Sequence, residues 1–231
     1  MADAIRRRWN TLVRASRAGR VLGPVVALAT YVQSRVLDVQ WYRVLDTRPP
    51  GAPPGGEAHT RLVTDADQAA VAAVGKNDLA EVTERRAAGD EVYLAELDGR
   101  PVGHYWFRRD RWDEANVEFS FAGDERWAYD LYVDPSTRGR GVAATLTLDA
   151  LADLADREGV RRMLCVIDVL NHSSLAAAER YGARVASEFI AVTVAGREWV
   201  RERTLATGQV SRAWHRASDP LRRTVPEPPE A

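Results

Sequence analysis

The chain has 231 residues, of which 45% are hydrophobic and 28% charged, the balance of a globular protein and not of a disordered or fibrous one. Its net charge is −1, but residues 1–36 carry seven arginines against one aspartate, so the remainder is acidic. This one-sided excess argues against nucleic acid as a partner. Cys165 is the single cysteine, which excludes an intrachain disulfide and a cysteine-based zinc site. No metal is expected, and the sequence indicates a cytoplasmic protein.

The first 47 residues are predicted to form a basic, amphipathic, helical extension. Apolar residues recur at spacings of three and four in two pieces: Ile5, Trp9, Leu12 and Val13, then Val25, Leu28, Ala29 and Val32. The uncharged run 21–32 is too short to span a bilayer, which needs about 20 residues. Such helices can pack on their own domain, on a second subunit of a homodimer, or on an anionic membrane surface. Packing on protein is favoured, because amphipathic stripes mostly face a core.

A linker is predicted at residues 48–58 (RPPGAPPGGEA), which hold four prolines and no apolar periodicity. One folded domain should then span residues 59–204, followed by a mobile tail, 205–231, that is rich in Arg, Ser and Pro. The first elements expected in the domain are a short strand at Arg61–Val63, a helical region at Asp65–Ala88 interrupted near residues 75–78, a hairpin of Glu91–Leu97 and Val102–Arg108, a β-rich stretch at 117–121, and a strand at Trp127–Val133.

The second half of the domain alternates helix and strand. Apolar spacing predicts a long helix within Gly139–Glu158, and a short apolar run predicts a buried strand at Arg162–Asp168. Asn171 is placed to cap a helix over His172–Tyr181. Two further strands are expected at Val185–Val194 and Glu198–Thr204.

The segment most informative about chemistry is Tyr129–Ala143, YDLYVDPSTRGRGVA. It predicts a strand, a loop with two arginines and two glycines, and the start of a long helix. Free N–H groups at a helix start and the helix dipole form an anion cradle, which glycines let the ligand approach. A diphosphate is the ligand expected at such a cradle. The alternative is an ordinary glycine-rich turn, which the absence of acidic residues from Ser136 to Ala143 disfavours.

The loop fits neither of two better-known phosphate motifs: it lacks the G-x-x-x-x-G-K-[ST] pattern, and no first-strand βαβ unit surrounds it. VDPSTRGRGVA instead resembles the acyl-CoA-binding motif of the GNAT acyltransferases, R-x-x-G-x-[GA], here Arg138-x-x-Gly141-x-Ala143. The order of elements across residues 60–204 is similar too, including an N-x-x-S helix start and a helix that ends in Tyr181-Gly182-Ala183.

The resemblance implies a GNAT-like α/β fold: a mixed, twisted, mostly antiparallel sheet flanked by helices and splayed at the cofactor-binding strand. Acetyl-CoA or another acyl-CoA would lie in the gap. The residues that it implies for cofactor binding are the strand positions Leu131 and Val133, the loop and helix-start positions Arg138, Gly139, Arg140, Gly141, Val142 and Ala143, and Asn171 and Ser174 near the thiol end.

The sequence departs from the family pattern at the two usual acid–base positions. Where many members carry a glutamate that takes the amine proton, this chain has Trp127. Where many carry a tyrosine that protonates the leaving thiolate, it has Ala178. Tyr181 lies one turn further along and is the remaining candidate for that proton. The alternative is a packing role, because the resemblance places a core leucine at this position.

Asp130 is the best candidate for the acceptor side, because the resemblance places a carboxylate there in members that act on cationic amines. The alternative is a structural ion pair with a nearby arginine such as Arg126. Glu118 and His104 are further candidates on adjacent strands, although a lone histidine on a strand is more often a structural residue than a base. Trp127 is a candidate for the core or for an aromatic cleft wall.

The leading hypothesis is therefore an acyl-CoA-dependent N-acyltransferase that acetylates a small-molecule amine by direct attack on the thioester. Two alternatives stay open. A member without turnover would bind acyl-CoA as a sensor or assembly module, and a membrane-surface enzyme, anchored through residues 1–47, would act on a lipid or envelope intermediate.

Overall fold

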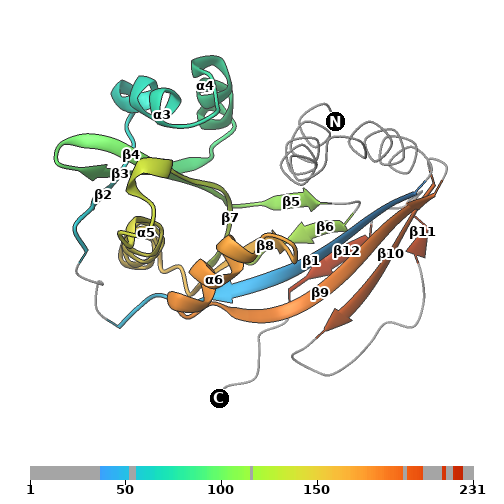
Figure 1. Ribbon diagram of the computed structural model, residues 1–231. Coiled ribbons are helices and arrows are strands. Elements are labelled where there is room, and N and C mark those ends of the chain that lie inside the picture. Colours follow the sequence, from blue (N-terminus) through green and yellow to red (C-terminus); the bar gives the residue numbers. More distant parts are fainter. Residues whose placement is uncertain are drawn as a thin grey trace, which may run out of the picture.

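The computed structural model describes residues 37–51, 56–114, 117–194, 197–204, 215–216 and 221–225. A nine-stranded sheet of order β11-β10-β9-β1-β8-β7-β4-β3-β2 runs through the molecule, and a three-stranded sheet of order β12-β6-β5 packs beside it (Figure 1). Every neighbouring pair in the large sheet is antiparallel except β7 and β8, which are parallel. The predicted mixed, mostly antiparallel sheet with flanking helices is confirmed.

The described strands and helices follow the predicted order closely from residue 59 onward. The strands are β1 Leu37–Thr47, β2 His59–Leu62, β3 Glu91–Leu97, β4 Arg100–Arg108, β5 Arg111–Glu114, β6 Val117–Ser120, β7 Glu125–Val133, β8 Arg162–Asp168, β9 Arg184–Val194, β10 Arg197–Thr204, β11 His215–Arg216 and β12 Leu221–Thr224. The helices are the 3-10 turns η1 Asp65–Asp67 and η2 Pro135–Thr137, and α3 Gln68–Val74, α4 Leu79–Ala87, α5 Val142–Glu158 and α6 His172–Arg180.

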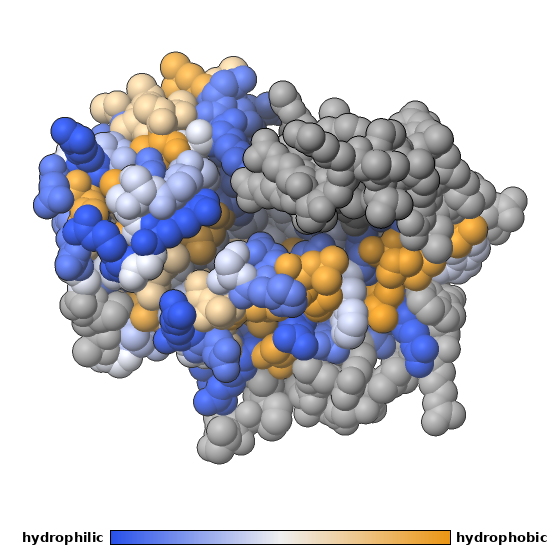
Figure 2. All heavy atoms as spheres, in the orientation of Figure 1, coloured by the Kyte–Doolittle hydropathy of each residue, from blue (hydrophilic) through white to orange (hydrophobic). Residues whose placement is uncertain are grey.

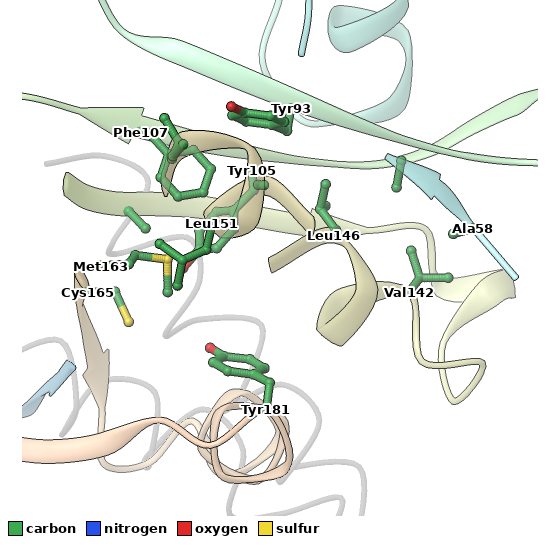
Figure 3. Close-up of a cluster of buried hydrophobic side chains, with 14 of the residues drawn as sticks. Ala58, Tyr93, Tyr105, Phe107, Val142, Leu146, Leu151, Met163, Cys165 and Tyr181 are labelled. Atoms are coloured by element: carbon green, nitrogen blue, oxygen red, sulfur yellow. The ribbon is translucent and has the colours of Figure 1, made fainter. Parts of the chain in front are cut away.

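Two layers cover the opposite faces of the large sheet. On one face α5 and α6 pack against Leu45, Tyr105 and Met163 in the largest core cluster, shown in Figure 3. On the other face α3 and α4 cover β3 and β4, where Trp106 is fully buried. The three-stranded sheet covers the rest of that face through a cluster around Trp127. All three clusters are needed to bury a sheet with two apolar faces.

Local signals set the ends of the elements that position the site. The Asp78 side chain accepts a hydrogen bond from the backbone N–H of Glu81 and so caps α4. Asp98 and Gly99 both have positive φ, as a tight hairpin turn between β3 and β4 requires. Gly159 ends α5 in the left-handed conformation.

The predicted end of the N-terminal extension, at residue 47, differs from the structure. Residues 37–47, assigned to a helical extension, form β1, which lies between β8 and β9 and pairs with both. The segment LDVQWYRVLDT suits a strand, but its partners lie more than a hundred residues later in the chain, and no local pattern indicates them. The helices expected within residues 1–36 lie outside the described residues.

The C-terminal boundary differs as well. Leu221–Thr224, assigned to a mobile tail, is strand β12 beside β6, and Val225 is buried. The Val225 carbonyl accepts a hydrogen bond from the buried Arg162 guanidinium, which also binds Asp46 of β1 and Glu125 of β7. A buried guanidinium needs such partners, so this contact ties β1, β7, β8 and the C-terminal strand together.

Candidate active site

The loop between β7 and α5 has the backbone form that an anion cradle requires. Gly139 and Gly141 have φ of 85° and 79°, the left-handed region that favours glycine. Gly141 is the N-cap of α5 and makes no side-chain capping bond, so the first N–H groups of the helix have no cap from the protein. No atom lies within 4 Å of where a Cβ would stand on either glycine. The loop is therefore open on its glycine side.

The charges at this loop fit a phosphate group. No acidic residue occupies the first turn of α5, and Arg138 and Arg140 are exposed. Arg140 pairs with Glu57, at 2.6 Å between Nη2 and Oε2, which brings the end of the 48–58 segment to the same loop. The side chain of Val142 is buried in the core, so only its backbone N–H can face a ligand.

Beside this loop the two parallel strands diverge. The ladder between β7 and β8 covers only Glu125–Trp127 and Arg162–Leu164, although β7 continues to Val133 and β8 to Asp168. Leu131 and Val133 lie on the part of β7 that is not paired with β8, and both pack partly against the main core cluster. The two strands thus splay apart as expected, and the separated end of β7 leads directly into the glycine loop.

A β-bulge in β7 shapes the other side of the splay. Trp106 pairs with Tyr129 and His104 with Tyr132, so two residues of β7, Asp130 and Leu131, stand opposite the single residue Tyr105 of β4. Asp130 lies in this bulge with φ of 53°, one of two non-glycine residues in the described chain with positive φ. The bulge turns the Asp130 side chain toward the α3–α4 turn.

There Asp130 is held by two side chains. Its Oδ2 accepts hydrogen bonds from Asn77 Nδ2 and Arg85 Nη1, each at 2.7 Å. Burial would raise the pKa of Asp130, but the bonds from Asn77 and Arg85 outweigh it and lower the pKa, so the group is a carboxylate at neutral pH. The ion pair weighed from the sequence thus exists, with Arg85. Arg126, the arginine considered there, binds Glu158 instead.

His104 lies directly behind this carboxylate. Its side chain is fully buried, with Nε2 4.0 Å from Asp130 Oδ2, and neither ring nitrogen has a hydrogen-bond partner in the described part of the chain. A Cβ on Gly75 would meet His104 Cε1 at 2.2 Å, so a glycine is needed there. Burial lowers the pKa of His104, and the imidazole is neutral.

Two of the other predicted acceptor residues do not join this cluster. Trp127, expected in the cleft wall, is fully buried between Phe119, Phe121 and Trp112, because the three-stranded sheet covers it. Glu118 lies on that three-stranded sheet, where Arg222 pairs with it at 3.5 Å. Trp127 therefore packs in the core and Glu118 forms an ion pair on the three-stranded sheet, and neither contacts Asp130.

The residues predicted at the thiol end lie at α6. The Asn171 side chain caps that helix by accepting from Ser174 N–H at 3.3 Å, as its sequence position indicated. Tyr181 follows the helix and reaches into the core toward Cys165 (Figure 3). Burial raises the pKa of the Tyr181 hydroxyl well above its ordinary value, so this group holds its proton firmly.

Two residues that hold Asp130, Asn77 and Arg85, were not found from the sequence. They lie 53 and 45 residues before Asp130, and neither belongs to a motif. The only local signal was the break near residues 75–78, which places Asn77 in a turn. In the described ranges no cluster of His, Cys, Asp and Glu could hold a metal ion. None of the described helices is long and apolar enough to span a membrane.

The Acetyltransferase (GNAT) family model matches residues 60–183, more than half of the chain, and the chain belongs to this family. The family membership that was predicted from the motif and the order of elements is confirmed. No curated protein matches the chain.

Several solved structures are similar to the chain. A protein described as a GNAT-family acetyltransferase from Novosphingobium aromaticivorans is 18% identical, with a TM-score of 0.49 over 69% of this chain and 65% of that one. A GCN5-related N-acetyltransferase from Sphaerobacter thermophilus is 16% identical, with a TM-score of 0.47 over 74% and 56%. A ribosomal-protein-alanine N-acetyltransferase from Brucella melitensis is 22% identical, with a TM-score of 0.42 over 54% and 83%. The chain thus spans less than two thirds of the length of the first two of these proteins.

Proposed function

We propose that the chain is an acyl-CoA-dependent N-acyltransferase that transfers an acetyl group to the amine of a small molecule. The observation that carries the proposal is the separation of β7 from β8 after Trp127, directly beside a glycine loop that opens a long helix. A long, narrow ligand with a diphosphate at one end fits a gap between strands that leads to a helix N-terminus.

The loop has room for the diphosphate of such a cofactor. Gly139 and Gly141 leave open space on the side where a Cβ would stand, and the start of α5 has no side-chain cap, so the residues present fit a diphosphate. Arg138 and Arg140 would add charge-assisted hydrogen bonds, with Arg140 exchanging Glu57 for the phosphate. Acyl-CoA would supply the activated acyl group as a thioester open to attack by the acceptor amine.

The acceptor would bind at Asp130. Because Asn77 and Arg85 both use Oδ2, the other carboxylate oxygen is the one that can accept a hydrogen bond from the amine. The bulge leaves backbone near Leu131 out of the β4–β7 register, where an N–H can polarise a carbonyl group. Tyr181 is the remaining candidate to protonate the departing thiolate, although its burial makes it a weak acid.

A second candidate function rests on the two departures from the family pattern. Trp127 and Ala178, at the positions that commonly carry the base and the acid, are both buried. A chain that binds acyl-CoA tightly but lacks turnover would act as a sensor or assembly module.

One experiment separates the two. The full chain is incubated with acetyl-CoA and a panel of primary amines, and free thiol is followed over time, with CoA binding measured in parallel by thermal shift. Amine-dependent thiol release supports the enzyme. Binding without release supports the sensor. Absence of both contradicts the proposed cofactor site.

A further inference from the structure

One face of β1, β9 and β10 carries an apolar surface that the described helices leave uncovered. We call it the apolar sheet face. It consists of two residues of β1, three of β9 and one of β10: Val39, Trp41, Ile190, Val192, Val194 and Trp199.

The strand register puts these side chains on one face. Val39 lies opposite Val192 and Trp41 opposite Ile190 across β1 and β9. Trp199 lies opposite Val192 across β9 and β10. Directly opposed residues share a face, and alternate residues along a strand return to it, so the six form one continuous cross-strand group.

This face is the continuation of the side that α5 and α6 cover. Further along β1 the same face leads to Leu45, which is buried in the main core cluster. Beyond that point none of the described elements buries it: Val39 is 53%, Trp41 44% and Val194 38% exposed. Figure 2 shows apolar side chains at the surface over β1 and β9. A contiguous exposed apolar patch usually marks a surface that another segment or molecule covers.

The chain itself supplies an apolar segment at the edge of this face. Residues 1–36 lead into β1 at Leu37, which pairs with Val194 at the edge of the apolar sheet face. The sequence pattern places Val25, Leu28, Ala29 and Val32 on one stripe of a helix. Only residues 33–36 separate that stripe from the strand, so no linker has to be crossed and the effective concentration is high.

The dimensions of the two surfaces match. From Val32 back to Leu28 a helix rises about 6 Å, and from Leu37 to Val39 a strand advances about 6.6 Å. From Val32 to Val25 the rise is about 10 Å, and from Leu37 to Trp41 the advance is about 13 Å. A helix that turns back at residues 33–36 would therefore set Leu28 over Val39.

Charge favours the same arrangement. Residues 1–36 carry a net charge of +6, and the rest of the chain carries −7. The segment and the domain attract each other, and the domain is the acidic surface nearest to it in every molecule.

We propose that residues 25–32 form a helix that folds back and docks on the apolar sheet face of its own chain. The occupant is thus this chain's N-terminal segment, and neither a second copy nor a membrane.

Cross-linking tests the position. Cys165 is the natural cysteine and is buried, so Leu28→Cys combined with Val39→Cys adds two accessible thiols to the full chain. A short bis-alkylating reagent such as dibromobimane should join them within one chain. The matched control pairs Leu28→Cys with Gln40→Cys, one residue along β1 but on the opposite face beside Asp38 and Tyr42. The control pair should give several-fold less product.

A second measurement tests whether the N-terminal segment covers the apolar sheet face. Deleting residues 1–36 should raise the fluorescence of an apolar dye such as anilinonaphthalene sulfonate several-fold, and adding Trp41→Ser and Val39→Thr should remove most of that rise. Equal cross-linking at Val39 and Gln40, products only between chains, or unchanged dye binding after deletion would each overturn the proposal. So would co-sedimentation of the full chain with anionic vesicles that protects the introduced thiol of the Val39→Cys variant, since a membrane would then be the occupant.

Discussion

The two halves of the candidate site are built from different parts of the chain. The glycine loop, Asp134 to Ala143, is continuous in sequence and offers mainly backbone N–H groups, fixed by two positive-φ glycines and a helix start. The acceptor side is a cluster of side chains, Asp130 with Asn77, Arg85 and His104, brought together from β7, β4 and the α3–α4 region.

This difference decides how each half responds to change. A site made of backbone fails when the conformation of the chain fails, and is insensitive to most side-chain exchanges. A site made of side chains fails when one charge or hydrogen bond is lost while the backbone stays in place. Variants can separate the two kinds of failure, and the most severe of them removes a central strand of the large sheet, β1.

Deletion of residues 1–47 should abolish folding, whereas deletion of residues 1–36 should not. The longer deletion removes β1 from between β8 and β9 and takes Asp46 away from the buried Arg162 guanidinium. Circular dichroism with thermal melting distinguishes the two deletion variants. A cooperative melt for the longer deletion would show that the sheet closes without β1.

Gly141→Val should abolish the thermal shift caused by CoA. A ligand at a hundred times its dissociation constant stabilises a protein by about 2.7 kcal/mol, and that gain should disappear. Valine cannot easily adopt φ of 79° and would also obstruct the open side of the loop.

The matched control is Gly159→Val, at the other end of α5. Gly159 has φ of 69° and open space around it, so it carries the same backbone strain without the anion cradle. Both variants should lose stability, but only Gly141→Val should lose the response to CoA. Loss of the response in both would mean that strain in α5, and not the loop, is responsible.

The loop was predictable from sequence because its signals are local. Arg138-x-x-Gly141-x-Ala143 follows a strand and precedes a helix within fifteen residues, and the structure gives Gly139 and Gly141 the conformations that such a turn demands. The hairpin of β3 and β4 and the helix pair α3–α4 were predictable for the same reason. Each depends on residues close together in the chain.

The features that were not predicted from the sequence depend on contacts between segments that are distant along the chain. Residues 37–47 were grouped with the basic extension, since their pairing with β8 and β9 leaves no local trace. Arg85 was indistinguishable from other surface arginines of a helix, and only the fold brings it to Asp130. Trp127 resembled a cleft residue because the short strand β5, absent from the prediction, contributes to the sheet that buries it.

Asp130→Asn should weaken acceptor binding by about 10- to 100-fold, the range expected when a charged hydrogen bond is lost. The KM for the amine should rise by more than kcat falls, because in the proposed function the carboxylate binds the acceptor and does not make or break bonds. Glu118→Gln is the control, since Glu118 pairs with Arg222 on the three-stranded sheet. If both substitutions raise KM alike, a general charge effect explains the result.

Tyr181→Phe should change kcat by no more than a few-fold. The hydroxyl is buried beside Cys165 and its pKa is raised, so it gives up a proton reluctantly. Steady-state thiol release with the best amine of the panel measures the effect. A loss of about a hundred-fold would correspond to nearly 3 kcal/mol of transition-state stabilisation and would make Tyr181 the acid that protonates the departing thiolate.

The smallest effect concerns His104 and appears only as a pH dependence of stability. Burial lowers the pKa of His104 in the folded chain, while the unfolded chain titrates near the ordinary value of about 6.5. Below that pH the unfolded state binds a proton that the folded state does not, so stability is lost as the pH falls, at no more than about 1.4 kcal/mol per pH unit.

Urea unfolding of the full chain at pH 7.5, 6.5 and 5.5 measures this loss. His104→Gln keeps a polar side chain of similar reach behind Asp130 but cannot titrate, so its free energy of unfolding should fall less steeply with pH than that of the parent chain. The exposed His172→Gln serves as control and should follow the parent profile. Parallel curves for the parent and His104→Gln would mean that His104 takes up its proton while the protein is folded. The 4.0 Å separation from Asp130 Oδ2 would then be an ion pair and not a neutral contact.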